Sequence, residues 1–89
     1  MTIAAEVKAS VWMLRITWGI SRDRQRTKVE VFRSYDGAMA ALHAFVTEWW
    51  NREMKGREMP SGRNEAIEWY FDKKCGDEDY EITEYVTRP

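Results

Sequence analysis

The sequence predicts an α+β fold, a two-layer sandwich in which a three-stranded, mainly antiparallel sheet carries two helices on one face. Apolar residues alternate in two early segments and one late segment, which is typical of strands. Between them, two segments repeat apolar residues at helical spacing. The 89 residues leave room for one core. We therefore expect a single domain over residues 1–89 in the order β-β-α-α-β.

The first two expected strands form an antiparallel hairpin. In residues 11–20 the even positions are apolar, namely Trp12, Leu14, Ile16, Trp18 and Ile20. In residues 27–35 the apolar face consists of Val29, Val31 and Tyr35, with Phe32 as an exception on the polar side. The tip, residues 21–26, has no Asn-Gly or Asp-Gly pair, which indicates a longer turn. Residues 1–8 show no pattern and are expected to be frayed or a loose strand extension.

The first expected helix runs from about Gly37 to Met54, with the Asp36 carboxylate as its N-cap. Its buried stripe consists of Ala38, Met39, Leu42, Phe45, Val46 and Trp49. The second helix runs from Glu65 to about Lys74, capped by Ser61 or Asn64 and ended by Gly76. Its buried stripe consists of Ile67, Tyr70 and Phe71.

The last expected strand covers residues 80–87, with Tyr80, Ile82 and Val86 on its apolar face. If it lies antiparallel beside the first strand, Glu81 and Glu84 come near Arg15; the strand order itself stays open. The expected core then comprises Trp12, Ile16, Val31, Leu42, Phe45, Trp49, Ile67, Phe71 and Ile82.

Charge is distributed unevenly along a chain whose net charge is only −1. Residues 1–35 carry seven basic and three acidic side chains, whereas residues 61–89 carry four basic and eight acidic ones. If these parts lie on opposite faces, each offers a separate docking surface. The chain has no long apolar run and no signal-peptide pattern, so we expect a cytoplasmic protein.

Few residues point to catalysis. His43 lies at the boundary of the first helix's stripe, with no serine or cysteine nucleophile placed beside it. Cys75 is followed by acidic residues that oppose thiolate formation, which favours buried packing or an idle thiol. Asp77, Asp79 and Glu81 alternate as calcium ligands do, but the glycine and the terminal glutamate of such a loop are not in register. We expect no enzyme activity, no metal and no cofactor.

Tryptophans outside the predicted core indicate a protein-binding surface. Helical spacing places Trp69 opposite Ile67, among carboxylates, and places Trp50 on an edge with Met39, His43 and Met54. The alternative is that the second helix packs over Trp50 and covers this edge. The expected partner-binding residues are Trp69, Glu65, Glu68, Asp72, Trp50, Asp77, Glu78, Asp79, Glu81 and Glu84.

Basic residues recur at every second position across the hairpin tip: Arg22, Arg24, Arg26 and Lys28. On an extended backbone they would project to one side, where they could contact phosphates. They could equally pair with carboxylates of an acidic protein partner, or simply be solvated. The eight carboxylates of the last third count against nucleic acid.

In size and element order, and in its many aromatic residues, the chain resembles small phage-encoded inhibitors of bacterial defence, anti-CRISPR proteins in particular. The resemblance implies that the protein blocks a CRISPR effector complex through charged and aromatic surfaces, the acidic last third occupying a basic groove. No shared motif carries residue roles across. Two hypotheses follow: a small protein-binding inhibitor, monomeric or homodimeric, and a small nucleic-acid-binding protein that uses the hairpin at residues 21–28.

Overall fold

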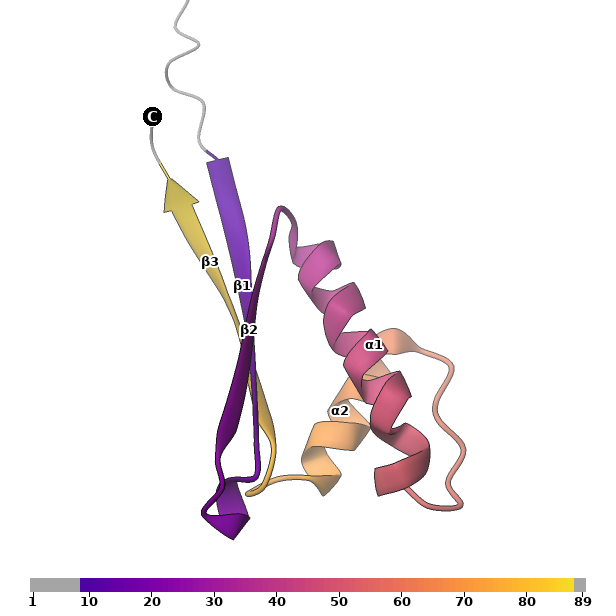
Figure 1. Ribbon diagram of the computed structural model, residues 1–89. Coiled ribbons are helices and arrows are strands. Elements are labelled where there is room, and N and C mark those ends of the chain that lie inside the picture. Colours follow the sequence, from indigo (N-terminus) through magenta and orange to yellow (C-terminus); the bar gives the residue numbers. More distant parts are fainter. Residues whose placement is uncertain (1–8, 88–89) are drawn as a thin grey trace, which may run out of the picture.

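The structure, a computed structural model, describes residues 9–87 and confirms the predicted fold class. The elements are β1 (Ala9–Trp18), a short 3-10 turn (Ile20–Arg22), β2 (Arg26–Phe32), α1 (Tyr35–Glu53), α2 (Arg63–Lys73) and β3 (Asp79–Thr87). The strands form one antiparallel sheet in the order β2-β1-β3, and both helices lie against one of its faces (Figure 1). The sequence had left this strand order open. The N-terminal segment 1–8, expected to be frayed, lies outside the described residues.

Strand pairing determines which side chains meet the helices, because residues directly opposite each other share a face. Leu14 pairs with Glu30 on one side and with Ile82 on the other. Leu14 and Ile16 are both buried beneath the helices, as the alternation in β1 predicts. Arg15 lies on the open face opposite Glu81 and forms an ion pair with it. Glu84, opposite Trp12, lies on the other face of the sheet from Arg15, so only Glu81 reaches this arginine.

The face predicted for β2 is wrong. Val29 and Val31 are 51% and 62% exposed, whereas Phe32 packs against the core. The register explains the reversal, since Phe32 pairs with Trp12 on the helix side and Val31 pairs with Met13 on the open side. The register with β1 therefore decides which face of β2 turns toward the helices, and the number of apolar residues on each face does not. Val31 does not belong to the core.

The C-terminal ends of both hairpin strands differ from the prediction. Strand β1 ends at Trp18, since Gly19 adopts the left-handed φ of 77° and Ile20 starts the 3-10 turn, where it is 39% exposed. A Cβ on Gly19 would lie 2.5 Å from the Arg24 carbonyl oxygen, so only glycine fits there. Strand β2 ends at Phe32, and Tyr35 opens α1 instead of extending the strand.

The helix caps also differ from those predicted. The side chain of Ser34, not Asp36, caps α1, because its Oγ accepts a hydrogen bond of 2.9 Å from the Gly37 amide. Asp36 lies in the first turn and accepts a hydrogen bond from Arg63 at 2.9 Å. Helix α2 starts at Arg63 without a side-chain cap, so neither Ser61 nor Asn64 serves as one.

The core lies between the sheet and the two helices. Its buried residues are Leu14, Ile16, Ala38, Met39, Leu42, Val46, Trp50, Met54, Ala66, Ile67 and Tyr70. Of the predicted core residues, Ile16, Leu42 and Ile67 are buried, and Trp12, Phe45, Trp49, Phe71 and Ile82 are partly buried against this cluster. Val86, expected on the apolar face of β3, is 54% exposed.

Candidate functional site: a groove between the hairpin and the helices

A groove of about 690 Å³ opens between the hairpin tip and the ends of the two helices. Figure 1 shows the tip at the bottom of the sheet, facing the ends of α1 and α2. The lining side chains come from the hairpin, from α1 and from the segment after α2. They are Trp18, Gly19, Arg22, Arg26, Lys28, Phe45, Glu48, Trp49, Arg52, Glu53, Lys74, Asp77 and Glu78.

Three half-buried aromatic side chains form the floor of this groove: Trp18, Phe45 and Trp49. The ring of Phe45 lies in the middle, with centroid distances of 6.4 Å to Trp18 and 6.3 Å to Trp49. Phe45 and Trp49 lie one helical turn apart on α1, while Trp18 ends β1 on the helix side. The floor is therefore an apolar surface that remains partly open to solvent.

The rim consists of the exposed lining side chains, of which four are cationic and one, Glu48, is acidic. Arg22, Arg26 and Lys28 come from the hairpin, and Arg52 comes from α1, where its guanidinium lies 5.0 Å from the centre of the Trp49 ring. The predicted row of four is broken, because the 3-10 turn and the left-handed Asp23 (φ 55°) interrupt the extended backbone. Arg24 is not among the lining residues.

Carboxylates at the base of the groove are held by partners within the chain. The ammonium of Lys74 lies 2.5 Å from Glu53, 3.6 Å from Glu78 and 3.8 Å from Asp77. Burial lowers the pKa of Lys74, but the three carboxylates outweigh burial and raise it above its ordinary value. Lys74 therefore stays charged and neutralises part of this acidic cluster.

Two of these carboxylates have further hydrogen bonds. The hydroxyl of Tyr70 donates to Glu78 at 2.7 Å, and the hydroxyl of Ser21 donates to Asp77 at 2.6 Å. The bond from Ser21 is the main reason that the pKa of Asp77 lies below its ordinary value. Asp77 and Glu78, expected on a partner surface, are thus engaged inside the molecule.

The structure decides between the two interpretations of the tryptophans. Trp50 is only 3% exposed and its Nε1 donates to the Arg57 carbonyl at 2.8 Å, so α2 and the loop between the two helices do cover this edge. Trp69 is half-buried against the core. Its ring lies 4.9 Å from the Arg57 guanidinium and 4.8 Å from the Lys73 ammonium. An exposed Trp69 among carboxylates is therefore wrong, since cations flank its ring.

The remaining acidic residues of the expected surface come from two elements. Glu65, Glu68 and Asp72 are exposed on α2, and Asp79, Glu81 and Glu84 are exposed on β3. Glu81 and Glu84 lie on opposite faces of the sheet, so these two do not belong to one surface.

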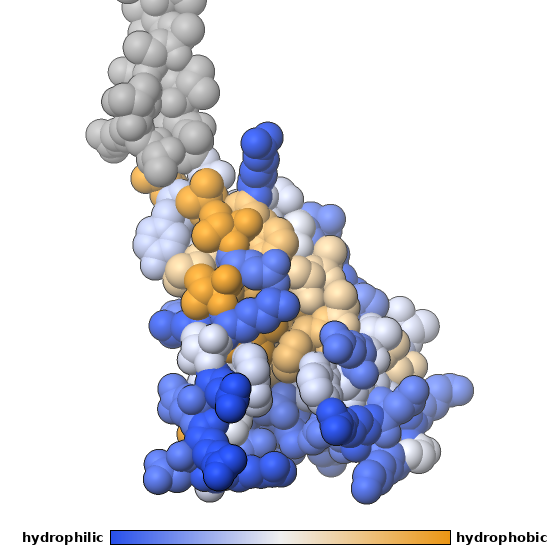
Figure 2. Space-filling model, viewed as in Figure 1, coloured by the Kyte–Doolittle hydropathy of each residue, from blue (hydrophilic) through white to orange (hydrophobic). Residues whose placement is uncertain are grey.

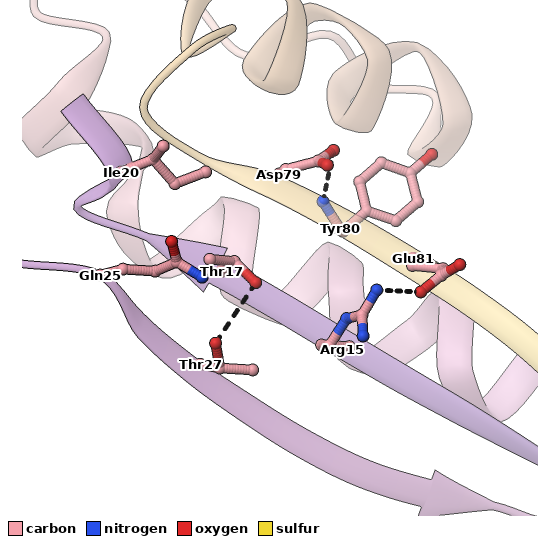
Figure 3. A pocket seen from close by; sticks show the side chains of 8 residues that line it. All are labelled: Arg15, Thr17, Ile20, Gln25, Thr27, Asp79, Tyr80 and Glu81. Atoms are coloured by element: carbon pink, nitrogen blue, oxygen red, sulfur yellow. Dashed lines mark hydrogen bonds and ion pairs between the residues drawn. The ribbon is translucent and has the colours of Figure 1, made fainter.

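A second, smaller pocket of about 330 Å³ is lined by residues of all three strands near the hairpin tip (Figure 3). Figure 3 shows Arg15 turned toward Glu81, its ion-pair partner, and the Thr17 hydroxyl facing that of Thr27, 3.5 Å away. The Asp79 carboxylate accepts a hydrogen bond from the Tyr80 amide. Most polar groups here are already paired with each other, so the aromatic groove is the stronger candidate site.

The residues considered for catalysis lie apart. The Nε2 atom of His43 is buried without a hydrogen-bond partner in residues 9–87. Cys75 is exposed just after α2, which excludes buried packing for it. Within the described chain, no three side chains of His, Cys, Asp or Glu are placed to hold a metal ion. Neither helix of that part of the chain is long and apolar enough to span a membrane.

Comparison with known proteins gives no family for this chain. Neither the protein-family models, nor the curated proteins, nor the solved structures contain a match. The candidate site therefore stands on its geometry. The sequence analysis assigned Phe45 and Trp49 to the core and did not single out Arg52. Arg52 follows Trp49 by three residues on one helix, and this spacing could have indicated that the two side chains are in contact.

Proposed function

We propose that the protein is a small non-enzymatic protein-binding module whose groove takes an acidic segment of its partner. One observation carries the proposal: an aromatic floor partly open to solvent lies directly beside four cationic side chains, those of Arg22, Arg26, Lys28 and Arg52. Aromatic residues and arginine are the side chains that most often dominate protein interfaces. An apolar side chain of the partner would occupy the floor, and its flanking carboxylates would meet the rim.

The distribution of charge favours a peptide over nucleic acid. Glu48 lines the groove and the carboxylates of Glu53, Asp77 and Glu78 lie at its base. A nucleic acid strand carries a charge at every phosphate and would have to bring several of them past these carboxylates. A peptide can place its own carboxylates at the rim alone and an uncharged side chain above the base.

Inhibition of a CRISPR effector complex or of another bacterial defence complex stays a prediction, which rests on the resemblance in size and element order. Binding of nucleic acid through the hairpin stays the alternative function. Both are compatible with a groove that recognises negative charge, so the test must separate peptide from nucleic acid.

The test uses fluorescence anisotropy with three labelled probes at about 150 mM salt. The first is an acidic dodecapeptide of Glu and Asp with one central tryptophan, the second has serine in place of that tryptophan, and the third is an oligothymidylate of about 20 nucleotides. We expect binding in the order first, second, third. Trp49→Ala should weaken binding of the first probe about thirtyfold, because truncation of an interface anchor costs about 2 kcal/mol of binding free energy.

The matched control is a pair of charge reversals in the same hairpin. Arg26→Glu should weaken the first probe about fivefold to tenfold, since an exposed charge pair contributes up to about 1 kcal/mol and reversal adds repulsion. Arg24→Glu, which makes the same change outside the groove, should leave binding unchanged. Equal losses of affinity in the two variants would contradict binding in the groove. Tighter binding of the oligothymidylate than of the acidic peptides would favour the nucleic-acid alternative.

A further inference from the structure

Strand β2 is an edge strand that nothing in residues 9–87 covers on its outer side, since its strand partner there is β1. Arg26 to Val31 are all exposed, and Phe32 is half-buried. Its pairing with β1 runs without interruption from Phe32 to Arg26, so no bulge bends the strand away, and the strand contains no proline. Such an edge presents unpaired backbone groups to which a further strand can add.

The two edges of the sheet differ in charge. Strand β3, the other edge, carries Asp79, Glu81 and Glu84 and no basic residue, so a second β3 beside it would bring like charges together. Strand β2 carries both signs, with Lys28 and Glu30 on either side of Val29. The two charged side chains share a face and form an ion pair of 3.1 Å within the chain.

If β2 pairs antiparallel with a second copy of itself, centred on Val29, residues of complementary charge and exposed apolar residues lie opposite each other. In that register Lys28 of each copy lies opposite Glu30 of the other, which gives two cross-strand pairs of opposite charge. On the open face Val29 meets Val29, and Val31 meets Thr27. The register thus joins the exposed valines of two copies, which are among the most exposed large apolar side chains of the described chain.

We propose that the protein forms a symmetric dimer through β2, antiparallel about Val29, with one continuous six-stranded sheet. The twofold axis runs perpendicular to the sheet, so both helical layers lie on the same side and the two open faces become one surface. Figure 2 shows that hydrophobic side chains gather over the upper part of the molecule, while the hairpin tip below is hydrophilic. The proposal does not rest on what the groove binds, although Lys28 lines the groove as well as the dimer edge.

The proposal is tested by reversing the charge at Lys28 and Glu30. The dimer Kd of each variant is measured by sedimentation velocity at protein concentrations between about 10 and 300 μM. Lys28→Glu places carboxylates opposite Glu30 of the second copy, and Glu30→Lys places two ammonium groups opposite each other. Each single variant should raise the dimer Kd at least tenfold. The double variant should restore it, and an equimolar mixture of the two single variants should associate with about the wild-type Kd.

The mixture is decisive because the ion pair within one chain is absent from both single variants and cannot be rebuilt by mixing. Arg24→Glu, a charge reversal outside β2, should leave the dimer intact, and tryptophan fluorescence checks that every variant is folded. A wild-type protein that stays monomeric at about 300 μM, or single variants that do not associate when mixed, would overturn the proposal. Open-ended larger assemblies would also overturn it, because they indicate head-to-tail pairing of β2 with β3.

Discussion

Tyr70 connects the aromatic core with the charged base of the groove. Its side chain is completely buried, and its ring lies 6.0 Å from that of Phe45 and 5.1 Å from that of Phe71. Its hydroxyl reaches out of this apolar environment to donate to Glu78. Burial, followed by the hydrogen bond to Glu78, raises the pKa of Tyr70 far above its ordinary value. The folded protein therefore keeps this hydroxyl protonated in alkaline solution.

Tyr70→Phe should lower the free energy of unfolding at pH 7 by about 1.5 kcal/mol, the lower end for a hydrogen bond to a charged group. The loss is small because the Glu78 carboxylate still has the Lys74 ammonium beside it when the hydroxyl is removed. It should also reduce the loss of stability above pH 10. There the unfolded chain releases the Tyr70 proton while the folded chain retains it, so rising pH favours unfolding of the wild type.

Urea titrations at pH 7 and pH 10.5 measure both effects. Tyr85→Phe is the control, because Tyr85 is 50% exposed on the sheet and its removal should change neither quantity. Identical alkaline losses in the wild type and in Tyr70→Phe would mean that Tyr70 ionises as easily in the folded as in the unfolded protein.

At the level of the elements, the sequence predicted the type and order of all three strands and both helices, with boundaries that shift by a few residues. Their periodicity is a local property and survives folding. The face of β2 could not be predicted in the same way, since it depends on the register with β1 that the tip at Gly19 establishes. The groove was missed for a related reason: Trp18 and Phe45 meet only through tertiary packing.

Because neighbouring residues of β2 lie on different faces, their substitution should change stability by very different amounts. Phe32→Ala should lower the free energy of unfolding by about 2 to 3 kcal/mol, because it removes a partly buried ring from the core. Val31→Ala should change it by less than about 0.5 kcal/mol, because Val31 is exposed. Urea melts at about 5 μM protein compare the two variants. A larger loss for Val31→Ala would support the face that the alternation in β2 favours.

In the molecule as a whole, the hairpin tip is fastened to the segment between α2 and β3. The Ile20 amide donates to the Asp77 carbonyl at 3.1 Å, and the Ser21 hydroxyl donates to the Asp77 carboxylate. These contacts connect the cationic rim of the groove to its base. The shape of the candidate site therefore depends on contacts among three residues, Ile20, Ser21 and Asp77.

Ser21→Ala should loosen the hairpin tip and speed hydrogen exchange of the Ile20 amide severalfold, as measured by NMR. It should also change the response to acid. The lowered pKa of Asp77 stabilises the fold above the carboxyl's ordinary value, and this stability is lost as pH falls through the lower, folded value. Without the Ser21 hydroxyl, the loss of folding stability in acid should be smaller.

Ser61→Ala, in the loop between the helices, is the control and should leave both measurements unchanged. Unaltered exchange at Ile20 in Ser21→Ala would show that the backbone contact to Asp77 holds the tip without help from the side chain.

The central position of β1 also sets the order of events during synthesis. Arg15 and Glu81, which pair across β1 and β3, are separated by 66 positions in the sequence. At ribosomal rates of roughly 5 to 20 residues per second, the nascent β1 waits several seconds for this second neighbour. During that time β1 and β2 can pair only with each other, so each strand has one unpaired edge. The newly made α1 supplies the apolar cover that is then available. Slower translation between α2 and β3 would lengthen the interval in which chaperones can bind the chain.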